Sequence, residues 1–203
     1  MHAKVPAVHR DGLLRILERY LEQHPDELVA VDHIRQFVRV HEDCFERSCL
    51  EGHITGSAWI VSPDHRSVLL HHHAKLDKWL QLGGHSDGDP DPFRVALREA
   101  REESGMATFR EPSGEAVPTP LDVDVHRIPE RGVEPAHLHL DVRYLLVAAP
   151  GQGLVRTEES KDLRWIPAGE IPSLTREESV LRLARKAMPR LRDGVVRPVG
   201  GSL

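Results

Sequence analysis

Three glutamates at helical spacing are the clearest chemical signal in the chain. Glu99, Glu102 and Glu103 stand at i, i+3 and i+4, so on a helix they share an arc of about 100°. Like charges at this spacing repel by roughly 0.2–0.5 kcal/mol per pair, and acids in a last turn oppose the helix dipole. A divalent cation removes both penalties, and carboxylate oxygens suit Mg²⁺ or Mn²⁺. For the helix alone, a solvated charged face is the alternative.

The residues around the glutamates predict a helix with defined ends. Asp91 followed by Pro92 suits a helix start, because Asp caps the first turn and Pro lacks an N–H that would have no partner there. Gly105 stands where a left-handed C-terminal cap is expected. An apolar stripe at i, i+3, i+4 and i+7 is formed by Phe93, Ala96, Leu97 and Ala100.

The stretch from Gly83 to Met106 resembles the Nudix box. That box is a glycine, five residues, a glutamate, seven residues and then R-E-U-x-E-E-x-G-U, with U a bulky aliphatic residue. The matching positions are Gly84, Arg98, Glu99, Glu102, Glu103, Gly105 and Met106. Two positions depart: Pro90 replaces the first Glu, and Ala100 is smaller than the usual first U. In the family the first Glu supports the box Arg and the metal site, so its replacement bears on how Arg98 is held.

The resemblance implies a metal-dependent hydrolase. Its substrate would carry a diphosphate linkage in a nucleoside diphosphate derivative: a nucleotide sugar, a dinucleotide or a nucleoside triphosphate. The implied ligands of Mg²⁺ or Mn²⁺ are Glu99, Glu102, Glu103 and the Gly83 carbonyl, and Arg98 would orient the acids by a charge-assisted hydrogen bond. A Nudix-fold ligand sensor or interaction module with weak or lost catalysis is the alternative. Pro90 favours that alternative, and the three retained glutamates argue against it.

The box does not name the general base. Some members of the family carry it as an acid on a later loop. Glu158 and Glu159, a few residues before Trp165, are the candidates here, and we choose Glu159 as the catalytic residue. The alternative for both is a solvated loop.

Histidines form the other polar groupings. His85 and Asp87 lie in the box loop and are candidate contacts to metal or phosphate, although Asp87 and Gly88 also suit a simple turn. His137, His139 and Asp141 alternate along a strand and so share a face. These two histidines are candidates for a transition-metal site or for lining the pocket. If imidazoles lie beside the acidic loop, their protonation would weaken cation binding as the pH falls through about 6–7.

A further histidine group ends an earlier predicted strand. His71 and His73 share a face, with Lys75 and Lys78 near enough to meet phosphate. The favoured interpretation of this group is an exposed polar strand end.

Composition limits the class of protein. The 203 residues suit one domain with an extension. A net charge of −5 without a long basic run argues against general nucleic-acid binding. No apolar run approaches the length of about 18 residues that a membrane helix needs, and the start has no apolar signal region, so we expect a cytoplasmic protein that does not bind membranes. Cys44 and Cys49 are too sparse to indicate a disulfide scaffold.

The expected fold class is α+β, an α/β/α sandwich in which a Nudix-like mixed sheet lies between helices. We expect an N-terminal helical extension at 1–51, a Nudix hydrolase domain at 52–192 and a C-terminal tail at 193–203. The extension would pack on the domain, form a homodimer contact or wall the substrate pocket. The predicted strands are Ile54–Ser62, Ser67–His73, Trp79–Leu82, Leu121–Ile128, His137–Ala148 and Leu163–Ile166, and Glu177–Leu191 is the predicted closing helix.

Overall fold

The computed structural model describes residues 7–132 and 135–193. Two helices come first, α1 (Ala7–Gln23) and α2 (Leu28–Val40), with a 3₁₀ turn, η1 (Pro25–Glu27), between them. After the sheet, η2 (Ala168–Glu170) and α4 (Ile171–Leu174) lead to α5 (Glu178–Asp193). Within the described ranges, no helix is both long and apolar enough to cross a membrane.

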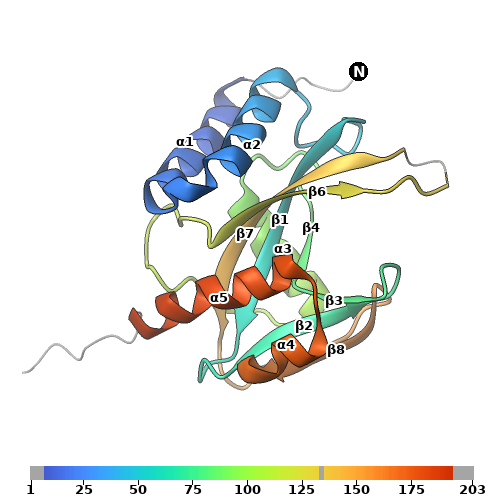
Figure 1. Ribbon diagram of the computed structural model, residues 1–203. Coiled ribbons are helices and arrows are strands. Elements are labelled where there is room, and N and C mark those ends of the chain that lie inside the picture. The colour runs from blue at the N-terminus through green and yellow to red at the C-terminus, as the bar shows by residue number, and fades with distance from the viewer. Residues whose placement is uncertain (1–6, 133–134, 194–203) are drawn as a thin grey trace, which may run out of the picture.

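The strands of the described chain belong to one mixed sheet (Figure 1). They are β1 (Gly52–Val61), β2 (Ser67–His73), β3 (Lys78–Leu80), β4 (Leu82–His85), β5 (Phe109–Arg110), β6 (Asp122–Ile128), β7 (His137–Ala148) and β8 (Ser160–Pro167). Strand β1 is central: it pairs in parallel with β7 and antiparallel with β2 and β4. Strand β6 pairs with the other edge of β7, and β8 pairs with β2.

Most predicted strands are confirmed, two of them with the same bounds, Ser67–His73 and His137–Ala148. The single strand predicted at Trp79–Leu82 is wrong, because the chain changes partner at Gln81: β3 pairs with β2, whereas β4 pairs with β1. Strand β5 was not predicted, since two residues are too few to show an alternating pattern.

Helix α3 (Pro92–Ser104) has the ends that its sequence predicts. The Asp91 side chain accepts hydrogen bonds from the amides of Phe93 and Arg94, and Gly105 ends the helix at φ 72°. The helix lies so close to β1 that a Cβ on Gly56 would stand 2.6 Å from the Pro92 carbonyl oxygen. This contact presses the helix, and the glutamates it carries, against the middle of the sheet.

The sheet is covered by helices on both faces, as the predicted sandwich requires. Helix α3 and the two N-terminal helices share one core with β1 and β7, and α5 covers a second core that includes Trp59 and Leu145. In Figure 1, α1 and α2 lie together above α5, which crosses in front of the sheet. Leu13, Leu17 and Ile34 are fully buried within this chain, so of the expected arrangements the structure shows the N-terminal stripes packed on the same chain.

Candidate active site

Two glycines bring the backbone of β4 into contact with the helix and with β1. Gly83 pairs with Ser57 and Gly84 with Gly56 across the two strands. A Cβ on Gly84 would stand 2.5 Å from the carboxyl carbon of Glu99, whereas one on Gly83 would stand 2.3 Å from the hydroxyl oxygen of Ser57. The Glu99 carboxylate therefore lies directly on the backbone of β4, where any larger residue would displace it.

Glu103 is the most deeply buried of the box acids. Its Oε2 accepts a hydrogen bond of 2.9 Å from the Gly83 amide, and the residue is only 4% exposed. Burial raises the pKa of the Glu103 carboxyl to about 8; the Gly83 amide opposes this shift, and the charges of Glu99, Glu159 and Glu102 add to it. A positive ion at this point would relieve both the burial and the repulsion.

Arg98 is anchored although Pro90 replaces the first box Glu. Its Nη2 donates to Glu99 Oε1 at 2.9 Å and to the carbonyl oxygen of His85. Its Nε lies 3.9 Å from an oxygen of Glu102, whose side chain is 62% exposed. Burial raises the pKa of Glu99 in spite of the Arg98 hydrogen bond. The backbone of the box loop thus gives Arg98 a partner that Pro90 does not provide.

Glu159 lies just before β8 and within electrostatic reach of the box acids. Its carbonyl oxygen accepts from the Ala74 amide at 2.8 Å, which ties the start of β8 to the end of β2. The Glu159 carboxylate is close enough for its charge to raise the pKa of both Glu99 and Glu103. It is exposed, as is the other candidate, Glu158.

His71 is a site residue that the sequence interpretation underrated. The favoured expectation, an exposed strand end, is wrong for it, because it is 3% exposed. Its Nδ1 lies 2.8 Å from the Ser160 hydroxyl oxygen and 3.8 Å from Glu103 Oε1. Burial lowers the pKa of His71 to about 4, so the ring is neutral at neutral pH. Leu69 lies two positions earlier on the same face of β2 and is buried. Its apolar side chain could have indicated that His71 is buried as well.

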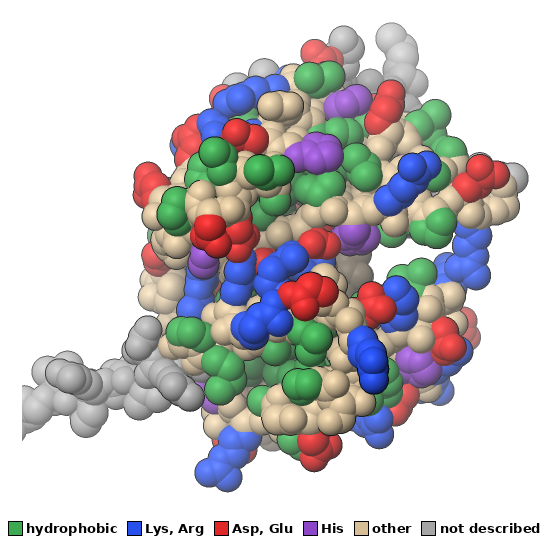
Figure 2. All heavy atoms as spheres, in the orientation of Figure 1, with side chains coloured by type: hydrophobic (Ala, Val, Ile, Leu, Met, Phe, Trp, Pro, Cys, Tyr) green, Lys and Arg blue, Asp and Glu red, His purple; other side chains and the backbone are tan. Residues whose placement is uncertain are grey.

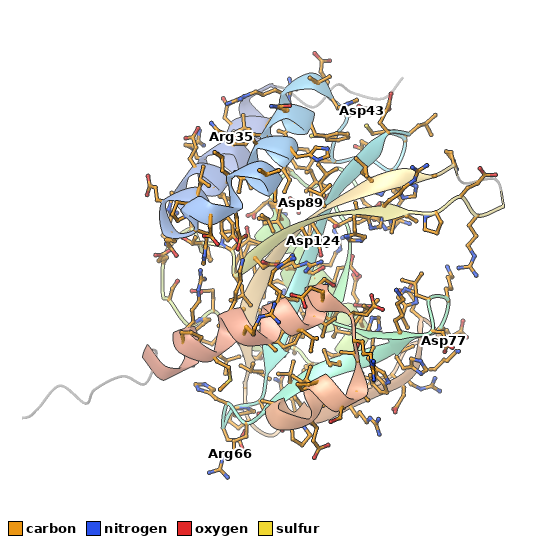
Figure 3. All side chains as sticks on the ribbon, in the orientation of Figure 1. Arg35, Asp43, Arg66, Asp77, Asp89 and Asp124 are labelled. Carbon is orange, nitrogen blue, oxygen red and sulfur yellow. The ribbon has the colours of Figure 1, made fainter. Side chains whose placement is uncertain are left out.

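The neighbours of His71 have other roles. The rings of His71 and His73 lie 5.4 Å apart, which confirms their shared face. Lys78 forms an ion pair with Glu177 at 3.0 Å, and Lys75 is exposed. Asp77, at the tip of the turn between β2 and β3 in Figure 3, pairs with Lys161 at 2.5 Å.

The predicted histidine candidates meet on the opposite face of β4. The His85 ring lies 5.0 Å from that of His139, and the His137 ring lies 5.1 Å from that of His139. The residue that the sequence interpretation missed is His53, whose ring lies 4.8–4.9 Å from all three. His53 could have been found from the sequence of β1, in which His53, Thr55 and Ser57 occupy alternate positions and so share one polar face.

Burial sets the protonation state of this cluster. It lowers the pKa of His85 to about 4 and that of His139 to about 2, and the neighbouring imidazoles add to both shifts. The expectation that such rings protonate between pH 6 and 7 is therefore wrong for these two. Asp87 is turned to another partner, since its carboxylate accepts two hydrogen bonds from Arg47, at 2.6 and 3.0 Å.

A buried ion-pair network continues from the histidines toward α5. Asp141 shares the face of His139, as predicted, and accepts hydrogen bonds from Thr55, Ser57 and Arg143. Arg143 also donates a hydrogen bond of 2.8 Å to Asp124. Figure 3 shows Asp124 between β6 and α5. The Asp141 carboxylate is thus engaged in the frame of the sheet.

Residues 53–189 match the family model described as NUDIX domain. The chain belongs to the NUDIX family. This membership confirms the expected fold and the expectation of a Nudix-type pyrophosphohydrolase. Helices α1 and α2 lie outside the matched segment of this NUDIX protein.

Solved structures share the fold of this NUDIX protein. A hydrolase of the NUDIX family from Clostridium perfringens is 28% identical, with a TM-score of 0.53 over 68% of this chain and 97% of that one. An Ap4A hydrolase from C. elegans is 16% identical, with a TM-score of 0.54 over 69% and 98%. The dihydroneopterin triphosphate pyrophosphohydrolase of E. coli is 17% identical, with a TM-score of 0.52 over 66% and 92%. None of the curated proteins compared with the chain matches it.

Proposed function

We propose that this protein hydrolyses a diphosphate linkage in a nucleoside diphosphate derivative, with Mg²⁺ or Mn²⁺ as cofactor. Glu99, Glu102, Glu103 and the Gly83 carbonyl would hold the cation. The observation that carries the proposal is Glu103, a buried carboxyl fixed on the Gly83 amide beside three other glutamates. Hard oxygen donors gathered in this way are the ligand type that Mg²⁺ and Mn²⁺ prefer.

The charges around the site support a cation. Glu99, Glu102 and Glu159 act on the buried carboxyl of Glu103, and each raises its pKa. Arg98 is in contact with these acids and already pairs with Glu99. A bound divalent cation would screen the diphosphate oxygens and lower the pKa of the water it holds. Without such screening, the glutamates would repel an anionic substrate.

Other residues of the site position the carboxylates and accept the proton of the attacking water. The Gly83 amide fixes Glu103, and Arg98 fixes Glu99, so both carboxylates are placed before substrate arrives. Glu102 is exposed and makes only a long contact of 3.9 Å with Arg98, which binding of the cation would replace. Glu159 is exposed on the loop before β8 and lies within electrostatic reach of the buried acids. We assign it as the general base that takes a proton from the attacking water.

The experiment is a panel of phosphate compounds incubated with the full chain. The panel contains dinucleoside polyphosphates, nucleotide sugars, nucleoside triphosphates and a pterin triphosphate, each with Mg²⁺, Mn²⁺ or a chelator. The proposal expects cation-dependent cleavage of at least one nucleoside diphosphate derivative, with one oxygen from ¹⁸O-labelled water in one phosphate product. Binding of a panel member without turnover in either metal would instead establish the second candidate, a ligand-sensing module, which the replacement of the first box Glu by Pro90 favours.

A further inference from the structure

Four histidines from three strands converge at one end of the sheet. His53 begins β1, His137 and His139 begin β7, and His85 ends β4. His53 and His139 are direct partners in the parallel pairing of β1 and β7. The rings of His53, His137 and His139 lie 4.9–5.1 Å apart, centre to centre.

The ligand atoms of three of these rings are close enough for one ion. One nitrogen or other ligand atom from each of His53, His137 and His139 lies within 4.8 Å of the others. Zinc–nitrogen bonds of about 2.0–2.1 Å in a tetrahedron set the nitrogens about 3.3 Å apart. The ligand atoms therefore need to approach one another by at most about 1.5 Å. His85, 4.8 Å from His53 and 5.0 Å from His139 by ring centres, can supply a fourth nitrogen.

Two nitrogens in the cluster are set for coordination. The Nδ1 of His137 lies 2.9 Å from the Pro135 carbonyl oxygen. A carbonyl only accepts, so Nδ1 carries the hydrogen and the lone pair of the neutral ring is on Nε2. This outer hydrogen bond to a carbonyl is the usual companion of a metal-binding histidine. The Nε2 of His139 is buried and has no hydrogen-bond partner among the described residues, which is costly unless a ligand occupies it.

We propose that His53, His137 and His139, with His85 as the fourth donor, bind one Zn²⁺ ion that ties β1, β7 and β4 together. Imidazole nitrogen is a donor for Zn²⁺ rather than for Mg²⁺. The site is separate from the carboxylates, because Gly84 faces Glu99 on one side of β4 and His85 faces the histidines on the other.

Solvent reaches this end of the sheet. His85 and His139 are only partly buried. The surface is hollowed between the β6–β7 hairpin and the turn that joins β2 to β3 (Figure 2). An ion therefore has a way in without unfolding of the strands.

The test measures Zn²⁺ binding to the full chain in excess Mg²⁺, by competition with a chromophoric chelator. The proposal expects one equivalent of Zn²⁺. His139→Asn should weaken its binding by at least about 100-fold, more than loss of an outer partner usually does. Glu103→Gln and the matched exposed variant His33→Asn should bind as the wild type does. Zn²⁺ should also raise the unfolding temperature of the wild type and not that of His139→Asn.

Two results would overturn the proposal. One is Zn²⁺ binding that survives His139→Asn and is lost in Glu103→Gln, because the ion would then belong to the carboxylates. The other is a wild type that binds no Zn²⁺ more tightly than the competing chelator. If His139→Asn does not fold, X-ray absorption of the zinc-loaded wild type decides: three or four imidazole ligands support the site, and fewer overturn it.

Discussion

The Gly83 amide, which is half-buried, donates a hydrogen bond of 2.9 Å to the buried carboxylate of Glu103 at Oε2. One strand residue thus fixes the position of an acid from the last turn of α3. The bond partly offsets the cost of burying this carboxylate, yet the pKa of Glu103 still rises to about 8. The remaining cost is what a cation would remove on binding.

Glu103→Gln should lower kcat/KM for any cleaved substrate by at least about 100-fold. The substitution keeps the size of the side chain and removes a cation ligand, and metal catalysis contributes several kcal/mol to the barrier. Glu178→Gln, the same change at an exposed ion pair with Arg185 on α5, is the matched control and should be neutral. Equal kinetics for the two variants would remove Glu103 from the site.

The pH dependence of stability should also report Glu103. The unfolded chain releases this proton near the ordinary pKa of 4.5, whereas the folded, cation-free protein holds it until about pH 8. Burial of the protonated Glu103 therefore contributes fully to the free energy of unfolding below pH 4.5. This contribution is lost as the pH rises from 4.5 toward about 8, by on the order of a few kcal/mol. Urea titrations in a chelator should show the wild type falling more steeply than Glu103→Gln between pH 5 and 8. Parallel curves would contradict this assignment.

Gly84→Ala should impair cation binding without unfolding the protein. The added methyl group would stand 2.5 Å from the carboxyl carbon of Glu99 and push that side chain off β4. We expect Mn²⁺ affinity and turnover to fall by at least about 10-fold, since even a displacement of about 1 Å can cost more than that. Gly12→Ala meets nothing within 4 Å and should leave Mn²⁺ affinity unchanged. Calorimetric titration with Mn²⁺ measures both, and an unaltered affinity in Gly84→Ala would show that Glu99 need not lie on the strand.

Leu17→Ala should test whether the N-terminal helices are part of the core. Leu17 is fully buried against the same core as β1 and β7, so truncation should cost about 2–5 kcal/mol of unfolding free energy. Leu50→Ala removes the same atoms from a side chain that is 63% exposed, and its effect should stay within about 0.5 kcal/mol. A loss in Leu17→Ala no larger than in Leu50→Ala, measured by urea unfolding, would show that α1 is dispensable.

Local patterns determined much of this fold. The cap at Asp91, the left-handed Gly105 and the apolar stripe defined α3 to within a residue. The alternation along His137–Ala148 defined β7, and the fixed spacing of the box placed Glu99, Glu102 and Glu103 on one helix face. These features depend on residues only a few positions apart, so the sequence alone expresses them.

Only the tertiary structure decided which distant residues meet. The pairing of His53 with His139 depends on the parallel register of β1 and β7, and the approach of Glu159 to Glu103 depends on how β8 lies against β2. Burial then determined the protonation states of the site, because it raises the pKa of Glu103 and lowers that of His85. No local pattern carries this information, because strand register and desolvation arise from packing of the whole core, in which every contact depends on the others.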